Sequence, residues 1–177
     1  MARDESPLFE TEQTLWEGDA ANISTADFNY ILGKEWRVED PAGTGEYKTI
    51  RAVRAHTSTL GAKDTVKFQA GNLGTDIDGF AASGQECAVM DDLLVNNVSL
   101  NDICYVVTAG PVNVVTKAAS PQIAAGAVIA SAGSGRVKPA AAGDFALGVA
   151  IDSATTSQTD TTIRALIGPK YARDYHG

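Results

Sequence analysis

The sequence predicts an all-β protein: a small β-barrel, β-tulip or sandwich body preceded by an extended, partly helical N-terminal arm. Three observations lead to this fold class. Short apolar segments recur along the 177 residues and are separated by many of the 17 glycines, which is typical of barrels and sandwiches. β-Branched valine and threonine are abundant, and both favour strands. The excess of acidic over basic residues is confined to the N-terminal residues 1–46. The length fits one domain with a core of its own.

The N-terminal arm is defined by its charge. Residues 1–46 hold eleven acidic and three basic residues, whereas residues 47–177 hold eleven of each. An acidic arm (1–46) is therefore expected to precede a neutral, glycine-punctuated β domain (47–177). Ser6 and Pro7 predict the start of a short helix that continues to Trp16, since serine caps helices and proline suits their first position. A second cap at 24–27 predicts a helix that ends at Gly33.

The β domain is predicted from its short apolar segments. Most have the four to ten residues usual for strands, and glycines such as Gly79 and Gly110 are expected in the turns between them. Two alanine-rich stretches, 118–125 and 140–142, are too short and too close to prolines to be helices. The candidate strands are Tyr47–His56, Thr65–Gln69, Glu86–Met90, Ile103–Thr108, Val112–Lys117, Ala127–Ala130, Arg136–Lys138, Leu147–Ala154 and Thr161–Ile167.

Several partners are excluded by composition. No window approaches the roughly 18 apolar residues of a membrane-spanning helix, so we expect no membrane association. The acidic, polar start differs from a secretory signal, which favours a reducing compartment. A formal net charge of −8 and the lack of a basic stripe with interleaved aromatics argue against direct nucleic-acid binding.

The two cysteines, Cys87 and Cys104, each lie in a hydrophobic run. Two thiols without a neighbouring histidine cannot complete a zinc site, which needs about four ligands. We favour two buried reduced thiols that pack as small apolar groups. A disulfide between them is the alternative.

No catalytic residue, metal ligand or cofactor is predicted. His56 is favoured as a surface imidazole over a catalytic base, and His176 is the penultimate residue. The sequence holds no nucleophile elbow, phosphate-binding loop or zinc-protease motif. The densest carboxylates are Asp76, Asp78, Asp91 and Asp92. Polar turn chemistry is favoured for them over calcium binding, because the remaining ligands of an EF-hand pattern are missing.

The arm carries the strongest signal of function. It contains five of the twelve aromatic residues, although a solvated acidic tail has few aromatics. We interpret its apolar residues as anchors on another chain, because buried aromatics dominate interface energetics. The alternative is that they fold back onto the core of the body. The predicted binding residues are Leu8, Phe9, Leu15, Trp16, Phe28, Tyr30 and Trp36.

The C-terminal half resembles a known family. AGAVIASAGSGRVKP at 125–139, ALGVAIDSA at 146–154 and TIRALI at 162–167 resemble the head decoration, or capsid cement, proteins of tailed bacteriophages. The resemblance covers about residues 98–168, and no residue of the arm matches a family motif. It implies a small β-barrel or β-tulip body and trimers or other clusters on the outside of the head. It also implies an extended N-terminal segment that contacts the major capsid protein.

The resulting hypothesis is a non-enzymatic protein, made in the cytoplasm of a host bacterium, that cements capsid subunits on the outer surface of the virion. A homotrimer or other homo-oligomer is expected from the small residues of 140–142. The first alternative is another virion part or adhesin, such as a tail, spike or glycan-binding module, although the body is poor in aromatics. A small metal-dependent enzyme built on the four carboxylates is a weaker alternative.

Overall fold

The computed structural model describes residues 14–16, 32–39, 46–57, 59–71, 74–94, 97–118, 121–155 and 159–168. Within these ranges every regular element is a strand, which confirms the all-β class. Most of the two helices expected in the arm lies outside the described residues. Thr14–Trp16, expected at the end of the first helix, forms a strand instead. The helix prediction is wrong for these three residues, since a neighbouring strand supplies hydrogen bonds that a short isolated helix retains poorly in water.

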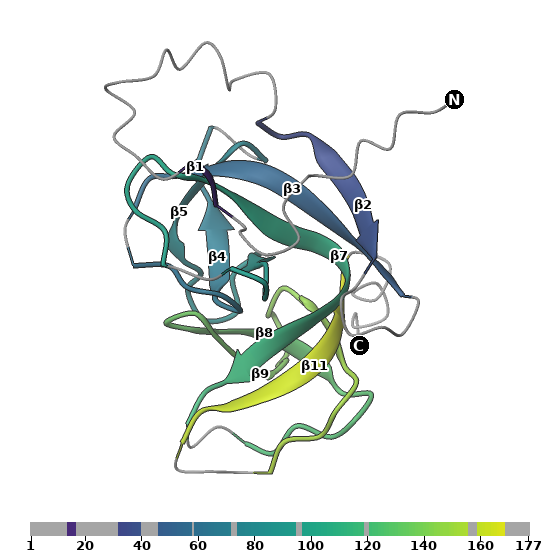
Figure 1. Cartoon of the computed structure of the whole chain (residues 1–177). Coiled ribbons are helices and arrows are strands. Elements are labelled where there is room, and N and C mark those ends of the chain that lie inside the picture. The colour runs from purple at the N-terminus through teal and green to yellow at the C-terminus, as the bar shows by residue number, and fades with distance from the viewer. Residues whose placement is uncertain are drawn as a thin grey trace.

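The strands are short except for one of fourteen residues that runs through the middle of the molecule (Figure 1). In chain order they are β1 (Thr14–Trp16), β2 (Glu35–Glu39), β3 (Tyr47–Ala55), β4 (Thr65–Phe68), β5 (Asp76–Phe80), β6 (Ala88–Met90), β7 (Ile103–Thr116), β8 (Val128–Gly133), β9 (Arg136–Pro139), β10 (Gly148–Ala150) and β11 (Thr161–Ile167).

The five strands from β3 to β7 close into a ring, which we call the first barrel. Its order is β3-β7-β6-β4-β5, and β5 returns to β3. Directions cannot alternate all the way around an odd number of strands, so one pair must be parallel. That pair is β3 with β5. Outside the ring, β2 pairs with β3 and β1 pairs with β7.

Five strands of the C-terminal half close in the same way and form the second barrel. Its order is β7-β11-β10-β8-β9, and β9 returns to β7 through the parallel pair Thr116 and Val137. Closure leaves few unpaired strand edges, which are the usual sites of uncontrolled association. The small barrel expected from the sequence is therefore present twice.

β7 belongs to both barrels (Figure 1). It passes from one to the other at Gly110. Up to Ala109 it pairs with β3, and from Gly110 onward it pairs with β11. Gly110 has a φ of +104°. A Cβ atom there would lie 2.7 Å from the backbone of both Tyr47 and Lys48. Only glycine fits this crossing, because both its conformation and the close approach of β3 exclude a side chain.

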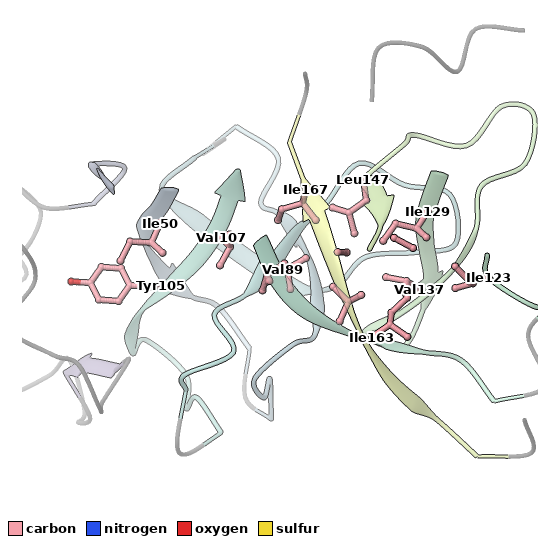
Figure 2. Close-up of a cluster of buried hydrophobic side chains, with 14 of the residues drawn as sticks. Ile50, Val89, Tyr105, Val107, Ile123, Ile129, Val137, Leu147, Ile163 and Ile167 are labelled. Atoms are coloured by element: carbon pink, nitrogen blue, oxygen red, sulfur yellow. The ribbon is translucent and has the colours of Figure 1, made fainter. Parts of the chain in front are cut away.

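Two hydrophobic clusters correspond to the two barrels. The smaller cluster takes residues from all five strands of the first barrel, including Val66, Ile77 and Val106. The larger one fills the second barrel and continues onto the outer face of the first (Figure 2). Alternation along β7 divides its side chains: Tyr105 and Val107 join the larger cluster, while Val106 joins the smaller. The two barrels therefore share one continuous apolar interface.

Most predicted strands agree with these elements, but Leu147–Ala154 is shortened to Gly148–Ala150, and β1, β2 and β5 lie outside the predicted strands. Thr161–Ile167 is confirmed at both ends, and neither alanine-rich stretch is helical where it is described. The turn expected around Asp76–Gly79 is instead strand β5, and Gly79 lies within it. The break expected at Gly110 is wrong as well, because the chain continues there as one strand.

Candidate functional site

Of the seven predicted binding residues, the structure describes the side chain of one. Trp36 lies on β2, half-buried against the larger cluster. Its ring meets that of Tyr105 edge-to-face, with centroids 5.7 Å apart. Trp36 therefore packs on the core of its own chain.

The other six residues are less defined. Leu15 and Trp16 lie in β1, which pairs with the start of β7. Leu8, Phe9, Phe28 and Tyr30 lie outside the described residues. The division of the chain at residue 46 stays a prediction, because most of residues 1–46 is not described. The last strand within residues 1–46, β2, pairs with β3 of the body over five residues.

A groove of about 370 Å³ lies where the two barrels meet. Arg51 and Phe68 of the first barrel form one part of it, and Phe145 and Ile167 of the second form another. Phe145 is 60% exposed. An exposed aromatic beside an apolar groove is typical of surfaces that bind another protein. This site could not be predicted from the sequence, because the residues that line the groove come together only when the two barrels pack against each other.

Arg51, which lines this groove, is held in place by several neighbouring side chains. The guanidinium of Arg51 lies 2.6 Å from a carboxylate oxygen of Glu35 and 5.8 Å from the ring centre of Phe68. Glu35 also accepts a hydrogen bond from Thr108. These contacts join β2, β3 and β7 along one rim of the groove.

His56 is paired with a carboxylate. Its Nε2 lies 2.6 Å from Oδ1 of Asp76, whose other oxygen accepts a 2.6 Å hydrogen bond from Thr75. The carboxylate lies between the imidazole and the hydroxyl. In a hydrolytic triad the imidazole must lie between the other two groups. This arrangement therefore favours a structural pair over a nucleophile and its base.

The carboxylates considered as metal ligands are engaged in ion pairs. Asp78 lies 3.5 Å from the amine of Lys67, and Asp91 and Asp92 both bind Lys48. Within the described ranges, no three His, Cys, Asp or Glu side chains gather as a metal site would require. The polar turn expected at Asp76 and Asp78 is wrong in its location, since both residues lie in β5.

Lys48 is buried at the start of β3 and forms the most enclosed charged cluster of the described chain. Its side chain is 1% exposed, and its Nζ lies 2.7 Å from Oδ1 of Asp91 and 2.7 Å from Oδ1 of Asp92. Burial favours the neutral amine, but the two carboxylates outweigh it and raise the pKa of Lys48. This cluster was also missed, because Lys48 lies more than 40 residues before the two carboxylates along the chain.

The two carboxylates of this cluster differ in their surroundings. Burial raises the pKa of Asp91 to about 6, against the opposing effect of Lys48. Burial acts on Asp92 in the same direction, but hydrogen bonds from Lys48 and Asn113 reverse it and lower its pKa. Asp91 is therefore the better proton carrier of the two.

A second ion-pair network fastens the barrels together. Arg136 of β9 lies 2.9 Å from Asp64, beside the first barrel, and 2.6 Å from Asp160, next to β11. The backbone amide of Thr65 also donates to the carbonyl of Gly135. The pair with Asp64 and this hydrogen bond connect the start of β9 to the start of β4.

Both cysteines are free thiols, as favoured from the sequence, and they form no disulfide. Cys104 is fully buried in the first barrel, and Cys87 is half-buried at the groove. Burial raises the pKa of Cys87 to about 12, and Glu86 adds to the effect. Such a thiol is a poor nucleophile at neutral pH.

In the described residues, no helix has the length and apolar character required to cross a membrane.

The fold of this chain is similar to those of several solved structures. No family model and no curated protein matches the chain. The fold is similar to the N base of the head fibre gp8.5 of bacteriophage phi29, with a TM-score of 0.46 and 18% sequence identity. The match covers 67% of this chain and 92% of that one. A likeness at this level assigns neither a family nor an activity.

Proposed function

We propose that this chain is a non-enzymatic structural protein of a tailed-bacteriophage virion, which binds the outside of the head and joins neighbouring subunits of the major capsid protein. The observation that carries the proposal is the contrast between the two parts of the chain. An acidic segment rich in aromatics precedes a neutral body whose described carboxylates are largely held in ion pairs. The resemblance of residues 98–168 to head decoration proteins supports the same function.

The mechanical logic needs no catalytic group. Packaged DNA presses outward on the shell, and the contacts between capsid subunits are the weakest points. A protein that binds the assembled lattice and not the separated subunits stabilises the lattice by mass action. Contacts with two subunits at once raise the effective affinity well above that of either contact alone.

The body suits this role through its rigidity. Two closed barrels share β7, and buried apolar contacts and the ion pair of Arg136 with Asp64 hold them together. Such a body transmits force between two attachment points with little internal movement. We assign one attachment point to the apolar residues of 1–31, and the second to the groove beside Phe145.

Self-association is a further part of the proposal. We expect a trimer, in keeping with the resemblance to decoration proteins. Ala141 and Ala142 are exposed in the loop between β9 and β10 and allow close approach of a second copy. Light scattering of the purified chain should give three times the monomer mass. A monomer mass in solution, together with single isolated copies bound on heads, would contradict this part.

Co-sedimentation with purified phage heads lacking decoration tests the function. The full chain should pellet with heads and saturate at a fixed copy number. A truncated chain lacking residues 1–31 should remain in the supernatant. The truncation ends before Leu32 so that β2 is kept on β3, and it removes the three-residue strand β1 from β7.

Two controls make the result interpretable. The truncated chain should keep its strand signal in circular dichroism and a cooperative thermal transition, which shows that binding and not folding was lost. A variant with Phe9, Phe28 and Tyr30 changed to serine retains the acidic charge of the arm but should fail to bind. Equal pelleting of the full and truncated chains would refute the assignment to the arm, and no pelleting of either would refute the function.

A further inference from the structure

The buried cluster of Lys48, Asp91, Asp92 and Asn113 contains a combination of groups that an ordinary ion pair does not need. Lysine is almost never fully buried unless it is paired, and here one amine faces two carboxylates at 2.7 Å each. The cluster has more acid than base and little contact with water. One carboxylate suffices to neutralise the charge of Lys48, so the second requires another explanation.

Asp91 retains an oxygen without a partner. Its side chain is fully buried. Oδ1 accepts hydrogen bonds from Lys48 and from the backbone amide of Leu93, whereas Oδ2 is buried and accepts none. An unsatisfied buried carboxylate oxygen is costly, and the cost falls when that oxygen carries a proton. Asp91 is thus placed to take a proton from the amine beside it.

Asp92 is held in the opposite manner. Its Oδ1 faces the amine of Lys48, while Oδ2 accepts hydrogen bonds from the side-chain amide of Asn113 at 2.7 Å and from its backbone amide at 3.3 Å. Two fixed donors on one carboxyl oxygen stabilise the negative charge that develops there when a nucleophile attacks the carbon. A nitrogen that is hydrogen-bonded to one oxygen of a carboxyl group also lies close to its carboxyl carbon.

We propose that Lys48 and Asp92 join through an isopeptide bond, with Asp91 as the proton carrier and Asn113 as the donor to the oxyanion. The ammonium of Lys48 passes a proton through Asp91 to Oδ1 of Asp92, and the neutral amine then attacks Cγ of the resulting carboxylic acid. Charge collects on Oδ2 beside Asn113. Oδ1, which already carries one proton, takes a second from the attacking nitrogen through Asp91 and leaves as water. An amide replaces an ammonium and a carboxylate, and one water molecule is lost, so atoms and charge balance without another reactant.

The first transfer is uphill, because a lysine amine holds its proton more strongly than a carboxylate does. Bond formation is therefore slow, but each molecule needs it only once. The surrounding apolar residues favour the product, since the reaction removes two buried charges. The bond would fasten the start of β3 to the segment after β6, across 44 positions of the chain. This inference does not depend on capsid binding.

Mass spectrometry of the intact, denatured full-length chain tests the proposal. The purified protein should be lighter than its sequence mass by one water molecule, and fragmentation of a protease digest should yield a branched peptide that joins Lys48 to Asp92. Lys48→Arg retains the positive charge but removes the nucleophile, so this variant should have the full sequence mass. Asp91→Asn retains the shape of the carrier without its function and should also have the full mass, or approach the lower one much more slowly.

Several outcomes would overturn the proposal. One is a full sequence mass for the wild-type chain after prolonged incubation, when circular dichroism shows that it is folded. Another is a loss of water that persists in Lys48→Arg, which would place the reaction elsewhere. A branch to Asp91 would reverse the roles given to the two carboxylates. If Lys48→Arg fails to fold, Asp92→Ala gives the same test from the other side of the bond.

Discussion

The passage of β7 between the barrels can be tested at Gly110. The substitution Gly110→Ala places a methyl group 2.7 Å from Cα of Lys48 and from the carbonyl oxygen of Tyr47. Both are backbone atoms, so β3 must move as a unit. The φ of +104° adds strain of about 1–3 kcal/mol for a residue other than glycine. Overpacking adds about 1–3 kcal/mol. The free energy of unfolding should therefore fall by about 2–6 kcal/mol.

Gly71 provides a matched control. Its φ is +86°, and a Cβ atom there meets nothing within 4 Å. Gly71→Ala therefore carries the conformational strain without the collision. The difference between the two variants isolates the close approach of β3, at about 1–3 kcal/mol.

Urea unfolding followed by circular dichroism measures both variants. With a slope of about 2 kcal/mol per M, a difference of about 2 kcal/mol separates the two midpoints by about 1 M. Equal midpoints for Gly110→Ala and Gly71→Ala would refute the crossing of β3 and β7 at this point. A lower midpoint for Gly71→Ala would refute it more strongly.

Three further predictions concern the described contacts. Trp36→Ala should lower the free energy of unfolding by about 2 kcal/mol, below the usual cost for a fully buried Trp because Trp36 is half-buried; no change in the urea midpoint would show that β2 contributes little to the body. Arg136→Met removes the ion pair with Asp64 that joins the barrels and the one with Asp160 inside the second barrel, and should cost about 1 kcal/mol, whereas Lys67→Met at the more exposed pair should cost almost nothing; thermal melting of the two variants side by side checks the order. Both thiols should react slowly with a thiol reagent at pH 8, Cys104 more slowly than Cys87, because burial raises the pKa of each, and immediate reaction of Cys104 would show that the first barrel opens readily.

Local pattern predicted much of the fold. Val112–Lys117 and Thr161–Ile167 are rich in β-branched residues; the first lies in β7 as far as Thr116, and the second is β11. β5 was missed because its sequence, DIDGF, is rich in residues that usually form turns. Its place in the first barrel comes from pairing with β3 and β4. Tertiary pairing overrides local propensity there.

The sites were harder to predict than the strands. Asp91 and Asp92 were recognised as a dense carboxylate pair, but their partner Lys48 lies 43 positions away from Asp91, and nothing in the local sequence connects them. Phe145 follows a loop glycine and resembles any exposed aromatic until Arg51 and Phe68 are placed opposite it. Contacts between distant segments depend on barrel closure, which single-sequence patterns do not specify.

Cryo-electron microscopy of phage heads saturated with the full chain tests the central claim most directly. The account predicts density for the two barrels on the outer surface, at the contacts between capsid subunits. Residues 1–31 should continue from β2 into contact with the major capsid protein. Bare heads at saturating protein, or bound barrels whose N-terminal segment contacts only its own chain, would contradict it.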